Sequence, residues 1–163
     1  MRLLAEILAW ALFALVVGAL SVWPRYEMLE RDDALVTLTF THAARRVGEC
    51  RNLTQEEMNE LPPNMRRPSD CPRERHPVRI ELRSADRLLY GEILLPSGIW
   101  SDGKANIYHR VVVPAGVHDL FIGMNDSGGL SGFDFEASRR VELHPGRNLV
   151  IRFDEQSQSF LIR

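Results

Sequence analysis

The sequence predicts a mainly β protein: an immunoglobulin-like or transthyretin-like β-sandwich of about eight strands, preceded by one N-terminal transmembrane helix. Three observations indicate this fold class. The chain begins with an uncharged apolar run. Short segments follow in which apolar and polar residues alternate, at the regular spacing typical of a sandwich. Turn residues, including Asp-Gly and Pro-Gly pairs, separate these segments.

Length and charge limit the number of domains and the kinds of partner. The chain has 163 residues and a formal net charge of -2, from 20 basic and 22 acidic residues. After the apolar segment about 130 residues remain, which suits one domain rather than two. Nucleic-acid binding needs a concentrated positive face, so we expect no nucleic-acid partner. The predicted parts are an anchor at 1-24, a juxtamembrane spacer at 25-34, and an exported β-sandwich domain at 35-163 with a Cys-bearing insertion at about 42-77.

The N-terminal run predicts a single membrane-spanning helix. Residues 7-23 carry no charge, and a helix of that length rises about 26 Å, close to the roughly 30 Å hydrocarbon core of a bilayer. Trp23 and Tyr26 lie where an interfacial aromatic belt is expected, and Pro24 fits a helix end. Arg2 and the terminal amine precede the span, and the charged residues that follow it are Arg25, Glu27, Glu30, Arg31, Asp32 and Asp33. The positive-inside rule then favours an N-terminus inside the cytoplasm, a single pass through the inner (cytoplasmic) membrane, and a domain in the periplasm or outside.

A cleaved signal peptide is the alternative explanation of the same run. Ala19 and Ser21 could form a small-residue cleavage pair before Val22. However, the apolar run is longer than the usual signal-peptide core, and the basic region before it is thin, so we favour an uncleaved anchor. Both explanations export the domain.

Alternation predicts the strands of the domain one after another. In the first strand, at residues 35-41, Val36, Leu38 and Phe40 occupy one face and threonines the other, so one face is buried. Pro114-Ala115-Gly116 and His144-Pro145-Gly146 predict tight turns. Further strands are predicted at 78-83, 88-95, 107-113, 117-124, 133-143, 149-153 and 160-162.

Residues 42-77 interrupt the alternation. Thr54 followed by Glu57 is typical of a capping box and predicts a short helix that continues to about Leu61. Pro62 and Pro63 end that helix, because proline lacks a backbone donor and its ring disfavours helix continuation.

Cys50 and Cys71 flank this short helix. In an oxidising compartment they can form a disulfide, which would stabilise the domain by roughly 3 kcal/mol in the chain-entropy model. The enclosed segment has little apolar material of its own, so a covalent link there makes physical sense. A metal or redox pair is the alternative, but the spacing is not that of a CxxC motif and no partner ligands are evident. We therefore predict a structural disulfide.

The histidines do not indicate a metal centre. A metal site needs three or four ligands that converge with fixed geometry. If Pro114 to Gly116 forms a hairpin, His109 and His118 are separated along its ladder, and we interpret both as half-buried strand residues. His144 lies in a turn and is expected to be exposed. The sequence therefore predicts no metal site and no cofactor. The five histidines are His42, His76, His109, His118 and His144.

No catalytic motif is present in the sequence. Ser127 lies in a Gly-rich loop with Asp126 beside it and His118 upstream, but nothing fixes a Ser-His hydrogen bond and there is no nucleophile-elbow pattern. There is no Gly-rich phosphate loop either. We predict no catalytic residue and no enzymatic activity.

Several short stretches carry a family resemblance. They are Thr41-His42-Ala43, Cys50, Leu61-Pro62-Pro63-Asn64-Met65-Arg66 and Cys71-Pro72-Arg73-Glu74-Arg75, and the strand-rich part from Pro96-Ser97-Gly98 onward fits the same outline. In these the chain resembles a family of uncharacterised single-span bacterial membrane proteins, which are similar to accessory proteins associated with respiratory oxidases. The resemblance implies an accessory role and carries no catalytic residue to this chain.

These observations together predict a membrane-anchored extracytoplasmic interaction module. We expect it to be an accessory or assembly factor of an integral membrane complex, such as a respiratory one, with the lipid bilayer and a membrane protein as partners. One alternative is a copper- or other metal-handling protein, suggested by the five His, five Met and two Cys. Another is a ligand- or carbohydrate-binding module that uses Trp100, Tyr90 and Tyr108 as a stacking surface.

Overall fold

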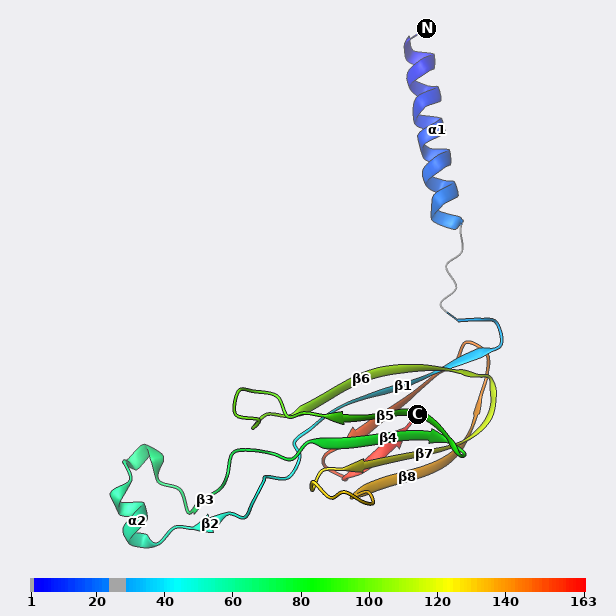
Figure 1. Cartoon of the computed structure of the whole chain (residues 1–163). Helices are drawn as coiled ribbons and strands as arrows, with labels where there is room; N and C mark the ends of the chain where they lie inside the picture. Colours follow the sequence, from blue (N-terminus) through cyan, green and yellow to red (C-terminus); the bar gives the residue numbers. More distant parts are fainter. Residues whose placement is uncertain (1, 24–28) are drawn as a thin grey trace. The chain divides into compact units, whose positions relative to one another are not determined.

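A computed structural model describes residues 2-23 and 29-163 (Figure 1). The chain divides into two compact units, Met1–Glu30 and Arg31–Arg163, and each is described here by itself. Pro24, Tyr26 and part of the predicted spacer at 25-34 lie outside the described residues.

The first unit contains the helix α1 (Arg2–Val22). By length and composition α1 is able to cross a membrane, and a signal sequence would satisfy the same criteria. None of its described residues is buried. The N–H of Trp23 donates to the carbonyl of Ala19 at 2.9 Å, which extends the helical hydrogen bonding by one residue.

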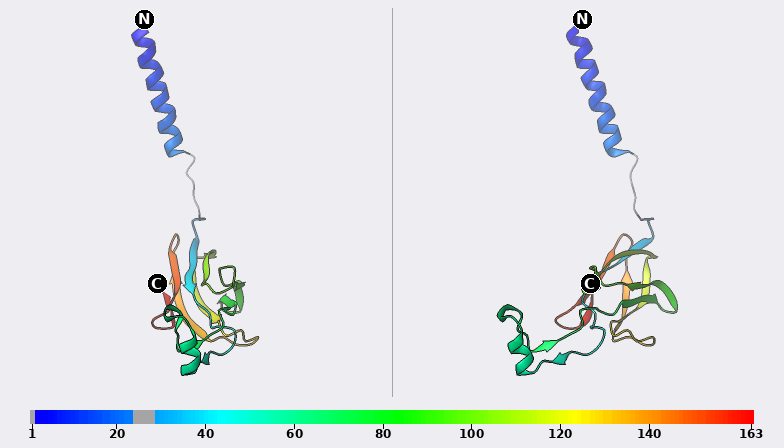
Figure 2. Two further views of the ribbon diagram at one scale, coloured as in Figure 1. Left: turned by 90° about the vertical axis from the view of Figure 1, so that its left-hand side faces the viewer. Right: turned by 60° about the vertical axis from the view of Figure 1, so that its left-hand side comes forward.

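The second unit is built on a β-sandwich, as the sequence predicts. Within the described residues, two four-stranded sheets have the strand orders β10-β9-β1-β6 and β5-β4-β7-β8. The two layers are visible in Figures 1 and 2. The strands are β1 (Asp33–His42), β4 (Val78–Ser84), β5 (Arg87–Leu94), β6 (Ala105–Pro114), β7 (Gly116–Asn125), β8 (Phe135–Leu143), β9 (Asn148–Asp154) and β10 (Ser159–Ile162).

The central strands supply the core between the sheets. Because side chains alternate between the faces of a strand, each central strand sends every second residue inward. Phe40, Phe153 and Phe160 meet edge to face within the first sheet, with ring centroids 5.1 to 6.4 Å apart. Among the described residues, nine large side chains are fully buried: Val36, Leu38, Val78, Ile80, Leu82, Leu120, Ile122, Met124 and Ile151.

The turn from Pro114 to Gly116 is a corner between the two sheets. β6 pairs with β1, whereas β7 pairs with β4 and β8. The hairpin considered from the sequence is therefore wrong, because β6 and β7 belong to different sheets. The N–H of Ala115 donates to the carbonyl of Asp32 at 2.7 Å, which ties the corner to the residue before β1. His109 and His118 consequently lie in different layers.

Strand β1 runs along the sandwich from one end to the other. It begins beside the turn between β8 and β9, where Gly146 N–H donates to Asp33 O at 2.7 Å and Leu35 N–H to Arg147 O at 2.8 Å. β1 pairs in parallel with β9 and antiparallel with β6. It ends at His42, so the chain leaves the sandwich at the end opposite to the one where β1 starts.

Candidate functional site

Between β1 and β4 the chain forms a two-stranded arm, residues 45-77, which projects from the sandwich in Figure 1 and in the right-hand view of Figure 2. At its base, the N–H of His76 donates to the carbonyl of Arg45 at 2.9 Å, and the N–H of Val47 donates to the carbonyl of Glu74 at 2.8 Å. Farther out, β2 (Arg51–Asn52) pairs with β3 (Ser69–Asp70) in an antiparallel two-stranded sheet. The predicted insertion at 42-77 is therefore an ordered ladder, and its first residue, His42, still belongs to β1.

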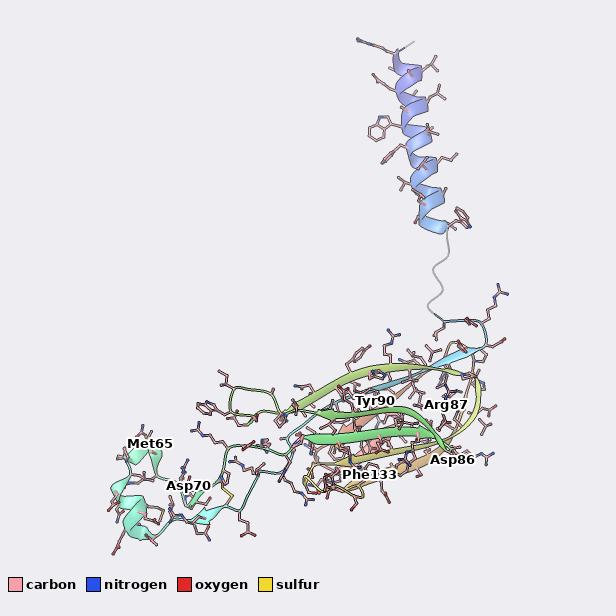
Figure 3. The ribbon with its side chains drawn as sticks, in the orientation of Figure 1. Met65, Asp70, Asp86, Arg87, Tyr90 and Phe133 are labelled. Atoms are coloured by element: carbon pink, nitrogen blue, oxygen red, sulfur yellow. A yellow bond between two sulfur atoms is a disulfide. The ribbon has the colours of Figure 1, made fainter. Side chains whose placement is uncertain are left out.

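A disulfide joins Cys50 and Cys71 in the middle of this ladder. It lies between the Arg46–Arg75 bridge and the β2–β3 pair, and Figure 3 shows it as a yellow bond. The pairing agrees with the one that the sequence predicts. The bond therefore links the two sides of the arm about halfway between the sandwich and the tip.

The tip of the arm is a short capped helix followed by a 3-10 turn. Helix α2 (Gln55–Glu60) has Thr54 as its N-cap, and Thr54 and Glu57 form the predicted capping box. Arg51 donates to Glu57 at 2.7 Å, and this hydrogen bond lowers the pKa of the Glu57 carboxyl. The chain then turns through the 3-10 helix η1 (Pro63–Met65). These local contacts give the tip a fixed shape without a core of its own.

The whole arm is accessible to a partner. None of residues 45-77, all of which the structure describes, is buried. Met65, at the tip labelled in Figure 3, is 61% exposed. A segment of this length normally offsets its ordering entropy by burying apolar surface. Here the disulfide and the caps hold the shape instead, so the surface remains free.

The base of the arm is fixed by polar contacts to the sandwich. The guanidinium of Arg75 donates to the carbonyls of Ala44 (2.6 Å) and Asp102 (2.9 Å). Buried His42 contacts buried Asp126, with Nε2 and Oδ2 2.8 Å apart. Asp126 also lies 3.3 Å from Nε of Arg45, the first residue of the arm. The arm is thus anchored to the ends of β1 and β7.

A second carboxylate supports this base from the β7–β8 loop. Asp134 accepts hydrogen bonds from the backbone N–H groups of Asp126 (2.9 Å) and Ser127 (3.1 Å) and from the Ser127 hydroxyl. Burial raises the pKa of Asp134, but these hydrogen bonds together with Arg45 outweigh it, so the pKa is lowered overall. Ser127 is therefore engaged with Asp134 and not with His118, which contacts Ser84 at 3.0 Å.

Basic side chains gather around the disulfide on one side of the arm. Arg46, Arg67 and Arg73 line one cleft together with Cys71. A backbone bridge pairs Arg46 with Arg75 at the base of the arm. We call the surface around this cleft the basic face of the arm.

Two adjacent clefts lie along this basic face. The first, the disulfide cleft, has a volume of about 360 Å³. The second, the tip cleft, has a volume of about 520 Å³ and shares Arg67 and Arg73 with the first. The disulfide cleft is lined by Arg46, Arg67, Ser69, Cys71, Arg73 and Asp102, and the tip cleft by Leu61, Asn64, Met65, Arg66, Arg67 and Arg73.

The remaining histidines are distributed over the second unit. His109 stacks on Tyr90, with ring centroids 3.9 Å apart, and the ring of His76 lies against the backbone of Gly128. His109 and His118 are half-buried and His144 is exposed, as the sequence predicts. Among the described residues, no three His, Cys, Asp or Glu side chains are placed to hold a metal ion together.

The methionines and aromatic residues that motivated the alternative functions are also dispersed. Met124 is fully buried in the core, whereas Met65 is at the arm tip. Trp100 and Tyr108 are each 69% exposed, but Tyr90 packs on His109 and burial raises its pKa to about 12. The contact between His42 and Asp126 is not predicted from the sequence. The one local indication of this contact in the sequence is that His42 falls on the same face of the predicted strand as Leu38 and Phe40.

No protein-family model matches the chain, and no curated protein matches it either.

Proposed function

We propose that this chain is a membrane-anchored extracytoplasmic interaction module, an accessory or assembly factor of an integral membrane complex, and that residues 45-77 are its main contact surface. The observation that supports this proposal is that no residue of the arm is buried, although a disulfide and a capping box order it. Ordered, unburied segments of this kind suit recognition, because a partner meets a surface that is already in its binding shape.

The helix α1 adds the second support. It is long and apolar enough to cross a membrane, and anchoring confines the domain near membrane partners and raises its effective concentration there. In this proposal the span crosses the inner membrane once with its N-terminus inside, and the domain is periplasmic or external. Exposure to an oxidising compartment would also maintain the Cys50–Cys71 disulfide. The resemblance to accessory proteins of respiratory oxidases makes such a complex the first partner to test.

Site-specific photo-crosslinking in native membranes tests the interaction. A photoreactive amino acid at Met65, on the arm tip, should give a discrete crosslinked species. The same residue at Val117, which is 56% exposed and lies at the other end of the sandwich, is the control and should not give that species. Excising residues 49-72 and rejoining the arm with a short turn should abolish crosslinking from a second probe at Arg46. Absence of a crosslink from Met65, or its equal yield from Val117, would contradict the proposal.

A reporter fused after Arg163 tests the orientation. In the proposed orientation a reporter that works only outside the cytoplasm should be active, because the C-terminus then lies beyond the span on the exported side. A cytoplasm-only reporter at the same position is the control. Strong activity of that control would show that the domain faces the cytoplasm.

A further inference from the structure

We propose that the basic face of the arm binds an extended acidic and apolar polypeptide segment of the partner, with carboxylates on Arg46, Arg66, Arg67 and Arg73 and an apolar side chain in the tip cleft. This inference rests on the proposed function, because it names the chemistry of the surface that the interaction module would recognise.

The charge of the clefts selects an anionic ligand. Four arginines line the two clefts, and Asp102 is the one carboxylate among the lining residues. Arg67 pairs with Asp70. In the part of the chain that the structure describes, Arg46, Arg66 and Arg73 form no ion pair. Arg46 donates to the Pro72 carbonyl at 2.9 Å and Arg66 to the Leu61 carbonyl at 3.3 Å. These contacts orient the guanidinium groups and leave further N–H donors available for carboxylates.

The backbone beside the disulfide requires a glycine. Gly48, two residues before Cys50, has a φ of +94°, a conformation that favours glycine. A Cβ at this position would lie 3.4 Å from Cγ of Pro72, so the two sides of the arm approach each other closely here. Among the described residues that line the clefts, Arg67 is the one arginine with a carboxylate partner, Asp70.

The tip cleft adds an apolar component to the recognition. Leu61 and Met65 supply its apolar lining, and Arg66, Arg67 and Arg73 supply its basic lining. Met65 is flexible and polarizable, and such side chains adapt to different apolar ligands. An apolar side chain flanked by carboxylates would bury its surface on Leu61 and Met65 while its neighbours reach the arginines. A free inorganic anion would use only the arginines.

The shape of the surface favours a polypeptide over a lipid bilayer. The two clefts are concave, adjoin each other and share Arg67 and Arg73. An extended chain can follow consecutive concavities and place one side chain in each. A bilayer presents a broad surface of headgroups, which would meet the ridges of the arm and leave the clefts unfilled. The disulfide at the centre of the ribbon fixes the spacing between the clefts before binding, so less ordering entropy is lost on association.

The test uses the full chain in nanodiscs of neutral lipid and two labelled peptide pools. One pool is built at random from Glu, Asp, Leu, Ile and Phe, and in the other Gln and Asn replace the acidic residues. We expect the acidic pool to bind at least about tenfold more tightly, with affinity that falls as salt rises, because charge-assisted contacts and their screening dominate. Empty nanodiscs give the background.

Matched variants assign the binding to the arm. The triple variant Arg46→Gln, Arg66→Gln, Arg73→Gln should lose about tenfold or more in affinity for the acidic pool. The control variant Arg87→Gln, Arg110→Gln, Arg152→Gln removes the same charge from exposed positions of the sandwich and should bind as the unchanged chain does. Met65→Ser should weaken binding of the acidic pool while it leaves the salt dependence unchanged. Circular dichroism verifies that each variant keeps its β signal.

Three results would overturn the inference: equal binding of the two pools, equal losses in the arm and control variants, or tighter binding to phosphatidylglycerol vesicles than to the acidic pool. The crosslink from Met65 separates this inference from the proposed function. If the triple arginine variant keeps the crosslink from Met65, the arm is still the contact surface and the acidic-peptide assignment alone fails. If the unchanged chain gives no crosslink, the proposed function fails.

Discussion

Nε2 of His42 lies 2.8 Å from Oδ2 of Asp126, and both residues are buried although 84 positions separate them in the sequence. His42 is the last residue of β1 and Asp126 follows the last residue of β7. The contact therefore ties one sheet to the other at the end where the arm begins. It also fixes the backbone position from which Arg45 starts the arm.

Replacing Asp126 with Ala should lower the free energy of unfolding by about 3 kcal/mol, because the buried His42 ring would lose its partner. Chemical denaturation measured by fluorescence tests this value. The double variant His42→Ala, Asp126→Ala should lose less than the sum of the two single variants, since both remove one interaction. Asp119→Ala at an exposed carboxylate is the control and should change stability by less than about 0.5 kcal/mol. Additive losses would show that the two side chains do not stabilise each other.

Asp134 should make stability depend on acid pH. Hydrogen bonds from Asp126 and Ser127 lower its pKa in the folded state despite its burial, relative to about 3.9 for an unfolded Asp. A depressed folded pKa contributes stability that is present above the unfolded pKa and is lost as pH falls through the folded pKa. Asp134→Asn should therefore be less stable than the unchanged chain at pH 7, and the difference should shrink below about pH 4. Denaturation curves at several pH values measure this difference, and a constant gap would contradict the prediction.

The helix α1 should remain part of the mature protein. An intact anchor keeps the protein in the membrane after carbonate washing, with Met1 or Arg2 at its N-terminus. Ala19→Leu together with Ser21→Leu would block cleavage at the small-residue pair, so these changes should leave mass and fractionation the same. Intact mass spectrometry of membrane and soluble fractions decides the question. A soluble protein that begins at Val22 would identify α1 as a signal peptide.

The sequence predicts the strands of the sandwich well because one face of each is buried. Alternation at Val36, Leu38 and Phe40 directly reflects the core, so the position of β1 is visible from local pattern. The strand with which each strand pairs is not visible from the local pattern. The corner at Pro114 to Gly116 has the composition of a hairpin turn, and only the strand pairing in the folded chain, β6 with β1 and β7 with β4 and β8, shows that the chain changes sheets there.

The sequence predicts where the arm lies along the chain, but it does not predict the structure of the arm. Neither face of its ribbon is buried, so its ladder leaves no alternation of apolar residues to detect. Local signals predict its helix cap at Thr54 and its disulfide, since these depend on residue type and spacing. The arginines form one basic surface only in the folded chain, where the pairing register places Arg46 opposite Arg75. Arg67 and Arg73 then line the same cleft. That register is a long-range property of the folded chain.

The last prediction is that the Cys50–Cys71 bridge orders the arm rather than the sandwich. The arm buries none of its residues 45-77, so its unfolding exposes little apolar surface and should be largely independent of the core. A bridge that closes a loop of this length stabilises by roughly 3 kcal/mol in the chain-entropy model, and here that stabilisation applies locally. Cys50→Ser together with Cys71→Ser should therefore leave the main melting transition nearly unchanged.

In the same variant, trypsin should cleave at Arg66 and Arg73 much faster than in the bridged protein, because cleavage needs a locally unfolded chain. Cleavage after Arg152, in β9 of the sandwich, is the internal control and should keep its rate. Mass mapping of the unreduced protein should find the two cysteine peptides linked. The core contains no arm residue among those described, so a large fall in the main melting temperature would mean that the arm and the sandwich unfold together, and the bridge would then stabilise the whole domain.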